Sequence, residues 1–154
     1  MRDAAWKVLQ DHGPAAHALL LRLTLRPDVA DDLLHELFVR TARKIGGAEN
    51  AGGYIRRVAI NLAMDWRRRE RRAKRTQPPP SRNIADPLKS ATEAEDVERI
   101  LDAAANLTEL ERDAFLLHYV QQESYEAVGR TLNRSPHQAR GLCHAAVKRI
   151  REQL

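Results

Sequence analysis

The chain has 154 residues, which is enough for one ordinary domain or two small ones. Hydrophobic residues make up 43% of it and charged residues 31%, a balance typical of a globular protein that excludes a disordered or a membrane-spanning chain. The net charge of +5 indicates a polyanionic partner. Only 5% of the residues are aromatic, and Val and Ile are sparse beside Ala, Leu, Arg and Glu, so the composition favours helices over strands.

Several function classes find no support in the residues. The single cysteine, Cys143, offers neither a disulfide nor a zinc set, which fits the reducing cytoplasm. Residues 1–10 lack a signal-peptide pattern, and the apolar stretch 15–25 is too short to span a membrane. The histidines are scattered without the spacing of metal ligands: His12, His17, His35 and His118. We therefore expect a cytoplasmic protein without membrane insertion, metal, cofactor or enzymatic activity.

The first clear helix starts at Pro27-Asp28, where acidic residues occupy the first turn. Its apolar residues recur at helical spacing: Val29, Leu33, Leu34, Leu37, Phe38 and Ile45. Gly46-Gly47 is predicted to end this helix, and Gly52-Gly53 to close the loop before the next one.

A second amphipathic helix begins at Tyr54 and ends in a strongly basic run. Its apolar stripe consists of Tyr54, Ile55, Val58, Ala59, Leu62, Ala63 and Trp66. Residues 67–75 then carry seven basic side chains and one Glu, which would repel one another in a free helix and so favour a polyanion such as DNA or RNA. A merely solvated helix end is the alternative, and a membrane surface is disfavoured because bulky apolar residues are not interleaved.

Residues 76–92 contain three consecutive prolines and are predicted to be a flexible linker. They would separate a helical domain at residues 1–75 from a second one at residues 93–154. Four helices are predicted in the second domain, at residues 93–105, 108–120, 124–132 and 136–153. The second of these opens with Thr-Glu-Leu-Glu at Thr108, the pattern of a capping box.

The last two helices fit a helix-turn-helix, although an ordinary amphipathic hairpin remains the alternative. Gly129 permits a close crossing, Asn133 tolerates the left-handed turn, and Ser135-Pro136 is a good N-cap followed by proline. One face of the last helix is apolar: Ala139, Leu142, Cys143, Ala146, Val147 and Ile150. The other could contact bases and phosphates: His137, Arg140, Gly141, His144 and Lys148.

Several motifs in order make the chain resemble an extracytoplasmic-function (ECF) sigma factor of the sigma-70 family. Residues 30–38, Ala-Asp-Asp-Leu-Leu-His-Glu-Leu-Phe, resemble the region 2 helix that docks on RNA polymerase. Residues 54–68 resemble the following motif, with its Ala-x-Asn-x-x-x-Asp core at Ala59, Asn61 and Asp65. Residues 107–112, residues 124–128 and the helix-turn-helix resemble region 4.

The resemblance implies an all-α protein with two small helical domains, region 2 and region 4, that directs promoter-specific transcription initiation. Its implied partners are RNA polymerase core, through the β′ clamp and the β flap, promoter DNA, and an anti-sigma protein in many relatives. The implied polymerase-binding residues are Asp31, Asp32, His35 and Glu36. Those implied at the −10 element are Tyr54, Arg57, Asn61, Asp65, Arg67, Arg68 and Arg71. Those implied at the −35 element are Arg134, His137, Gln138, Arg140, His144 and Lys148.

The chain departs from the family pattern at three places. His35 stands where the family has Gln, the loop 46–53 is short and lacks an aromatic residue, and Leu142 and Ala145 replace the usual arginines of the recognition helix. Fewer phosphate contacts predict weaker binding at the −35 element. Two alternatives stay open: a helix-turn-helix regulator that does not engage polymerase core, and an interaction protein that occupies the polymerase clamp.

Overall fold

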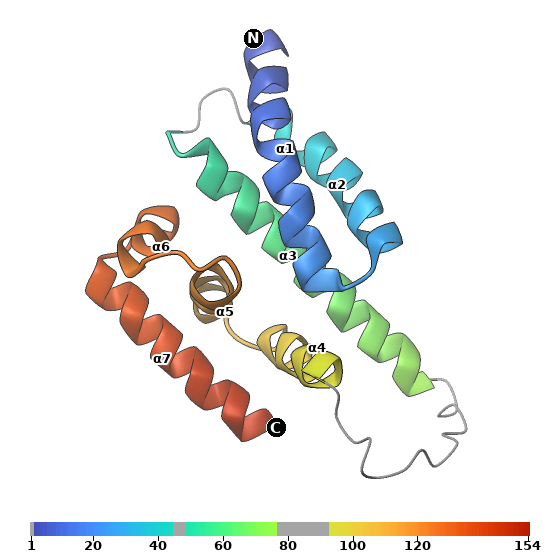
Figure 1. The fold of residues 1–154 in the computed structure, drawn as a ribbon, viewed down its shortest axis with the longest axis vertical. Coiled ribbons are helices and arrows are strands. Elements are labelled where there is room, and N and C mark those ends of the chain that lie inside the picture. The colour runs from blue at the N-terminus through green and yellow to red at the C-terminus, as the bar shows by residue number, and fades with distance from the viewer. Residues whose placement is uncertain (1, 45–48, 77–92) are drawn as a thin grey trace.

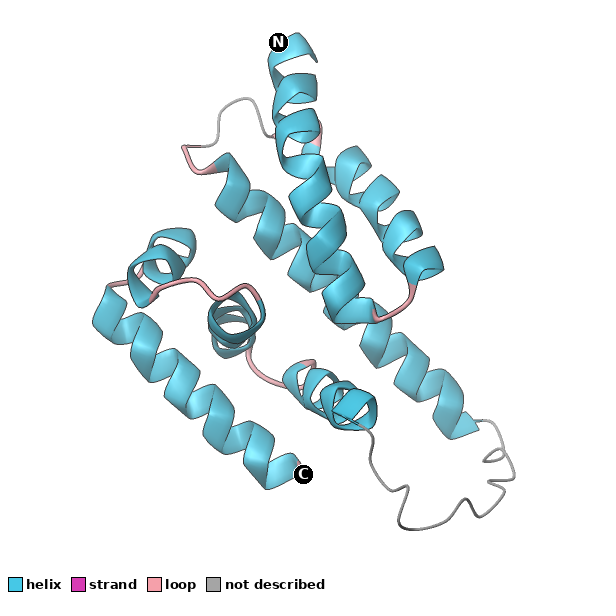
Figure 2. Cartoon of the chain, viewed as in Figure 1, coloured by secondary structure: helices cyan, strands magenta, loops and turns pink. Residues whose placement is uncertain are grey.

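The computed structural model describes residues 2–44, 49–76 and 93–154, and every regular element within them is helical (Figures 1 and 2). The all-α prediction is therefore confirmed. In chain order the elements are α1 (Arg2–Thr24), α2 (Pro27–Thr41), α3 (Ala51–Thr76), α4 (Glu93–Ala104), α5 (Glu109–Phe115), a π-helical turn η3 (Leu116–Val120), α6 (Tyr125–Leu132) and α7 (Pro136–Gln153). None of the described helices is both long and apolar enough to cross a membrane.

Helices α1, α2 and α3 form the first half of the molecule, with α1 packed against both of the others (Figure 1). Leu19, Leu20 and Leu23 of α1 are fully buried, as is Leu37 of α2. The short connection from α1 to α2 passes through Leu25, which has a φ of 58°. These three helices form a core that holds α2 with one face outward.

The predicted helix starts are correct at α2 and wrong at α3. Helix α2 begins at Pro27, which needs no N–H partner at this position. Gly52 and Gly53 do not close a loop but lie in the first turn of α3. The cause is Asn50, whose side-chain oxygen accepts a hydrogen bond from the Gly53 N–H at 3.1 Å and so caps the helix earlier than the glycine pair suggests. Ile45, Gly46-Gly47 and the proline-rich stretch 77–92 lie outside the described residues.

Helices α4 to α7 form the second half, in which α7 packs against α5 and α6. Leu116, Leu117 and Val128 are completely buried there. Cys143 lies on the inner face of α7, where its thiol donates to the Ala114 carbonyl oxygen at 3.3 Å. Cys143 is buried, as predicted, and burial raises the pKa of its thiol to about 11.

The predicted helix 108–120 differs from the structure in two ways. Its α-helical part ends at Phe115, and the following turn is π-helical. Thr108 is the N-cap, but its side chain makes no capping hydrogen bond, so the predicted capping box is wrong. Glu111, the residue that would complete the box, instead pairs with Arg149 of α7 at 3.4 Å. The Glu111 side chain thus has a partner on another helix.

The two halves touch along α3, which lies against α4 and α6 (Figure 1). Ile60 and Met64 lie one turn apart on α3, between Arg56 and Arg67, and neither is exposed to solvent. Both flanking arginines reach partners on the second half. The sequence analysis placed neither Ile60 nor Met64 in the apolar stripe of α3. The face on which they lie packs against residues far along the chain, and the periodicity of α3 alone does not reveal that contact.

Candidate functional site

The outer face of α2 carries an acidic patch. The predicted polymerase-binding residues share this face because they lie three or four positions apart, and they are partly or fully exposed: Asp31, Asp32, His35 and Glu36. Two of them have neighbours within the first half: Asp31 contacts His17 at 2.8 Å, and Glu36 pairs with Arg40 at 2.7 Å. Exposed carboxylates with such surface partners remain accessible to another protein.

Val39 extends the same face by one turn and is 63% exposed. Its side chain was not singled out from the sequence, although a valine following Glu36 at helical spacing was the available signal. An exposed apolar side chain beside these carboxylates adds an apolar contact to the face.

The predicted −10 residues lie on α3, and the structure divides them into two groups. Arg57 points toward the second half, where its guanidinium contacts Asp113 at 3.1 Å and Glu109 at 3.3 Å. Tyr54, Asn61, Asp65 and Arg68 keep part of their surface in solvent. Arg68 is paired with Asp65 one turn before it. Arg57, at 32% exposure, is as accessible to solvent as this group, but its guanidinium is held by the two carboxylates of the second half.

Arg67 was predicted to contact DNA, but only 2% of its side chain is exposed. Its Nε donates to the Leu23 carbonyl oxygen at 2.7 Å, and its Nη1 lies 2.7 Å from Glu98 and 3.0 Å from Asp102. Arg71, one turn later, donates to the Asp102 carbonyl oxygen at 3.3 Å. In this structure these two side chains bind protein groups of α1 and α4.

Arg56 is a residue of α3 that the sequence analysis missed. Its guanidinium lies 3.0 Å from Glu123 and donates to the Thr131 hydroxyl at 3.3 Å. Nothing local distinguishes Arg56 from Arg57, so only the placement of the second half could reveal its partners.

Burial changes the pKa of the carboxyl groups that take part in these contacts. The Asp113 side chain is 1% exposed between Arg57 and the buried Arg112, yet burial raises the pKa of its carboxyl group above the ordinary value. Burial likewise raises the pKa of Glu123, opposed by Arg56. At both carboxyl groups the effect of desolvation on the pKa exceeds the opposing effect of the arginines.

The helix-turn-helix geometry of α6 and α7 matches the prediction. Asn133 adopts the left-handed conformation with a φ of 57°. A Cβ at Gly129 would stand 2.5 Å from the Arg134 carbonyl oxygen, so only glycine permits this crossing. Ser135 caps α7 as predicted, and the capping box that it forms with Gln138 is an additional feature that the sequence analysis did not identify.

The outward face of α7 carries most of the residues predicted for the −35 element, all of them exposed: His137, Gln138, Arg140, His144 and Lys148. The Gln138 side chain also takes part in the cap of α7, where its oxygen accepts a hydrogen bond from the Ser135 N–H at 2.9 Å. Arg134 folds back onto the turn, where it donates to the Asn133 carbonyl oxygen at 3.1 Å. Gly141 lies in open space on this face, where an added Cβ would meet no atom within 4 Å.

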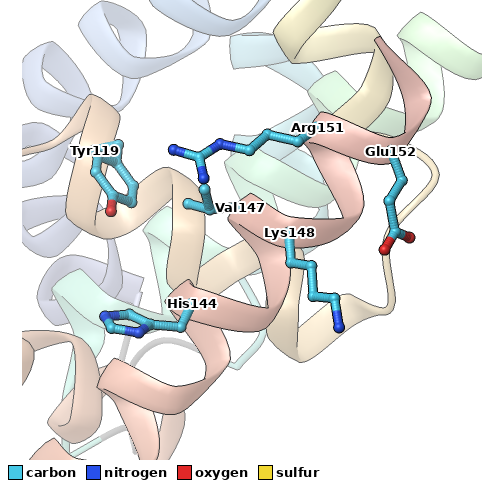
Figure 3. A pocket seen from close by; sticks show the side chains of 6 residues that line it. All are labelled: Tyr119, His144, Val147, Lys148, Arg151 and Glu152. Carbon is cyan, nitrogen blue, oxygen red and sulfur yellow. The ribbon is translucent and has the colours of Figure 1, made fainter.

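A hollow lies beside the C-terminal half of α7 (Figure 3). It is lined by Tyr119, His144, Val147, Lys148, Arg151 and Glu152. Arg151 extends toward Tyr119 of η3, whereas Lys148 and Glu152 point away from it (Figure 3). The sequence analysis missed Tyr119 and Arg151, since the π-helical turn that presents Tyr119 has no pattern of its own.

The described residues contain no group of three or more His, Cys, Asp or Glu side chains that could hold a metal ion. The candidate surfaces are one acidic helix face, on α2, and two helix faces rich in basic residues, on α3 and α7.

Comparisons with known proteins agree with this layout. The chain matches sigma-70 region 2 over residues 8–73 and sigma-70 region 4 over residues 97–150. It is 30% identical to the RNA polymerase sigma-E factor of Streptomyces coelicolor, over 86% of this chain and 76% of the relative. It is 28% identical to the RNA polymerase sigma factor CarQ of Myxococcus xanthus, over 99% of this chain and 92% of the relative.

A solved structure has a similar fold: the sigma factor RpoE of Bartonella quintana, crystallised in complex with the anti-sigma factor NepR. The TM-score is 0.53 at 19% identity, and the match covers 99% of this chain and 97% of that one.

Proposed function

Because this chain belongs to the ECF group of the sigma-70 family, we propose that α2 binds RNA polymerase core while α3 and α7 recognise two elements of a promoter. The chain then directs promoter-specific transcription initiation in the cytoplasm, and it contributes no catalytic step of its own. The observation that carries the proposal is the combination, in one chain, of an exposed acidic face on α2 and an exposed basic face on a capped recognition helix.

The acidic face of α2 is the proposed docking site for the β′ clamp of core polymerase. Asp32, His35 and Glu36 supply its polar contacts, and Val39 supplies an apolar one. A polar face with an apolar residue at one end suits a reversible contact with another protein.

The −10 element is assigned to α3. Tyr54 can stack on an unpaired base, and Asn61 can hydrogen-bond base edges, while the arginines of this helix bind backbone phosphates. The −35 element is assigned to α7, whose exposed His137, Arg140 and Lys148 can enter a major groove. Since both halves belong to one chain, each weak contact raises the effective concentration of the other.

Co-purification with RNA polymerase core tests the docking face. We expect wild-type protein to be retained and Asp32→Ala/Glu36→Ala to be lost. The matched control is Glu93→Ala/Asp96→Ala, which removes two exposed carboxylates from α4 and so changes the net charge equally. Retention of both variants would remove α2 from the proposal, and failure of the wild type to bind core would favour a DNA-binding regulator instead.

A further inference from the structure

Gly141 lies inside α7 at a position where the fold itself does not need a glycine. Among the described glycines it is the one at which an added Cβ would meet no atom within 4 Å. None of the glycines that the structure describes has a positive φ, so an unusual backbone conformation does not explain it. Helix α7 runs without a break through this position. A glycine inside a helix lowers the equilibrium constant for folding roughly fivefold relative to alanine, so Gly141 only weakens the free protein.

A glycine that serves neither a turn nor internal packing has one remaining physical use, which is to let a ligand come close to the backbone. Gly141 lies at the centre of the outward face of α7. It is nine residues from the buried Ile150, and at roughly 100° per residue the two lie on opposite sides of the helix. His137, one turn before Gly141, and Lys148, about two turns after it, are both exposed. Gly141 also belongs to the N-terminal half of α7, the part of a recognition helix that contacts base edges.

The backbone at Gly141 favours an apolar partner. In the middle of a helix each N–H and C=O group is bonded within the helix. A hydrogen-bonding atom of a base would therefore lose its water at Gly141 without gaining a partner. The apolar group that the major groove presents is the C5 methyl of thymine. Arg140 and His144, exposed on the same face, can hold flanking phosphates and base edges.

We propose that Gly141 is a specificity-determining residue of α7. The C5 methyl group of one thymine packs against the helix backbone at Gly141, in the space that any side chain would occupy. The proposal rests on the assignment of α7 to the −35 element, and it adds a base preference that comes from the absence of a side chain.

The variant Gly141→Ala adds a single methyl group at this point. The new Cβ meets no atom of the protein, and alanine is the better helix former. The Tm, measured by circular dichroism, should therefore rise by about 2–4 °C. A lower Tm would show that Gly141 serves the packing of the protein itself, and would overturn the proposal.

DNA binding should change in the opposite direction. The probe is the duplex that the full chain with RNA polymerase core enriches from a pool with a randomised central stretch. Each thymine of this duplex is then replaced singly by deoxyuridine, which lacks the C5 methyl group. The wild type should bind one of the substituted duplexes about fourfold more weakly, the effect of one buried methyl group. Gly141→Ala should bind the thymine duplex at least roughly fivefold more weakly than the wild type does. It should prefer the deoxyuridine duplex, because the missing methyl group leaves room for the new Cβ.

Lys148→Ala is the matched control on the same face, since it removes a side chain suited to a phosphate contact. It should weaken binding to every duplex alike and leave the ratio of thymine to deoxyuridine affinities unchanged. The same ratio in Gly141→Ala as in the wild type, or an equal loss on all duplexes, would overturn the proposal and leave α7 as a DNA-binding helix. If the wild type enriches no duplex, the assignment of α7 itself fails and the proposal fails with it.

Discussion

Arg67 offers a direct test of whether a basic residue in the DNA-binding motif serves the fold. The perturbation is Arg67→Met, which keeps most of the volume of the buried stem and removes the guanidinium. The Leu23 carbonyl oxygen then loses a charge-assisted hydrogen bond, worth about 1.5–3 kcal/mol. The contacts to Glu98 and Asp102 add little, roughly 0.2–1 kcal/mol each, because both carboxylates are partly solvated.

A smaller effect opposes this loss of stability. The substitution also removes the buried Nη2 atom, which lacks a hydrogen-bond partner among the described residues. Burying that atom without a partner costs about 1 kcal/mol. The net destabilisation is about 2 kcal/mol, and at roughly 2–4 °C per kcal/mol for a chain of this size the Tm falls by about 4–8 °C. The matched control is Arg68→Met, whose side chain is 35% exposed and pairs with Asp65.

Circular dichroism at 222 nm during heating measures both variants. The control should stay within about 1 °C of the wild type, since exposed pairs of this kind contribute little. A Tm unchanged in Arg67→Met, or equally lowered in both variants, would refute the structural role of Arg67 and return it to the set of DNA contacts.

Two further predictions concern the second half. Burial raises the pKa of the Cys143 thiol to about 11. The thiol should therefore resist iodoacetamide at pH 8 in the folded protein and react once per chain in denaturant. Rapid labelling of the folded protein would show that the helix packing around Cys143 opens. Ser135→Ala should cost about 1 kcal/mol of unfolding free energy because it removes the capping box of α7, whereas Thr108→Ala should cost less because the Thr108 side chain makes no capping bond. Urea unfolding of the two variants decides this, and equal losses would contradict the difference between the caps.

The helix-turn-helix could be predicted from the sequence because its determinants are local. Asn133, Ser135 and Pro136 act within a few residues of themselves, and Gly129 meets a carbonyl group only five positions away. The all-α fold follows for the same reason, since amphipathic periodicity is a property of each segment alone.

The partners of the basic residues could not be predicted, because they lie far away in the chain. Arg57 and Asp113 are 56 residues apart, and Arg67 and Glu98 are 31 apart. A run of arginines has the same appearance in a sequence whether it faces DNA or carboxylates of the same protein. The failed capping box at Thr108 has the same cause on a smaller scale, since Glu111 was taken by Arg149 of another helix.

The three candidate faces differ in how the fold exposes them, and this difference suggests an order of events. The acidic face of α2 and the basic face of α7 both lie open to solvent, while the arginines of α3 are paired with the second half. If α2 is the docking face for core polymerase, as proposed, it is accessible in this arrangement while the arginines of α3 are still paired. The energy needed to part the two halves would then come from contacts that only the complex with core supplies, since a ligand shifts such an equilibrium only by its preference for the open state.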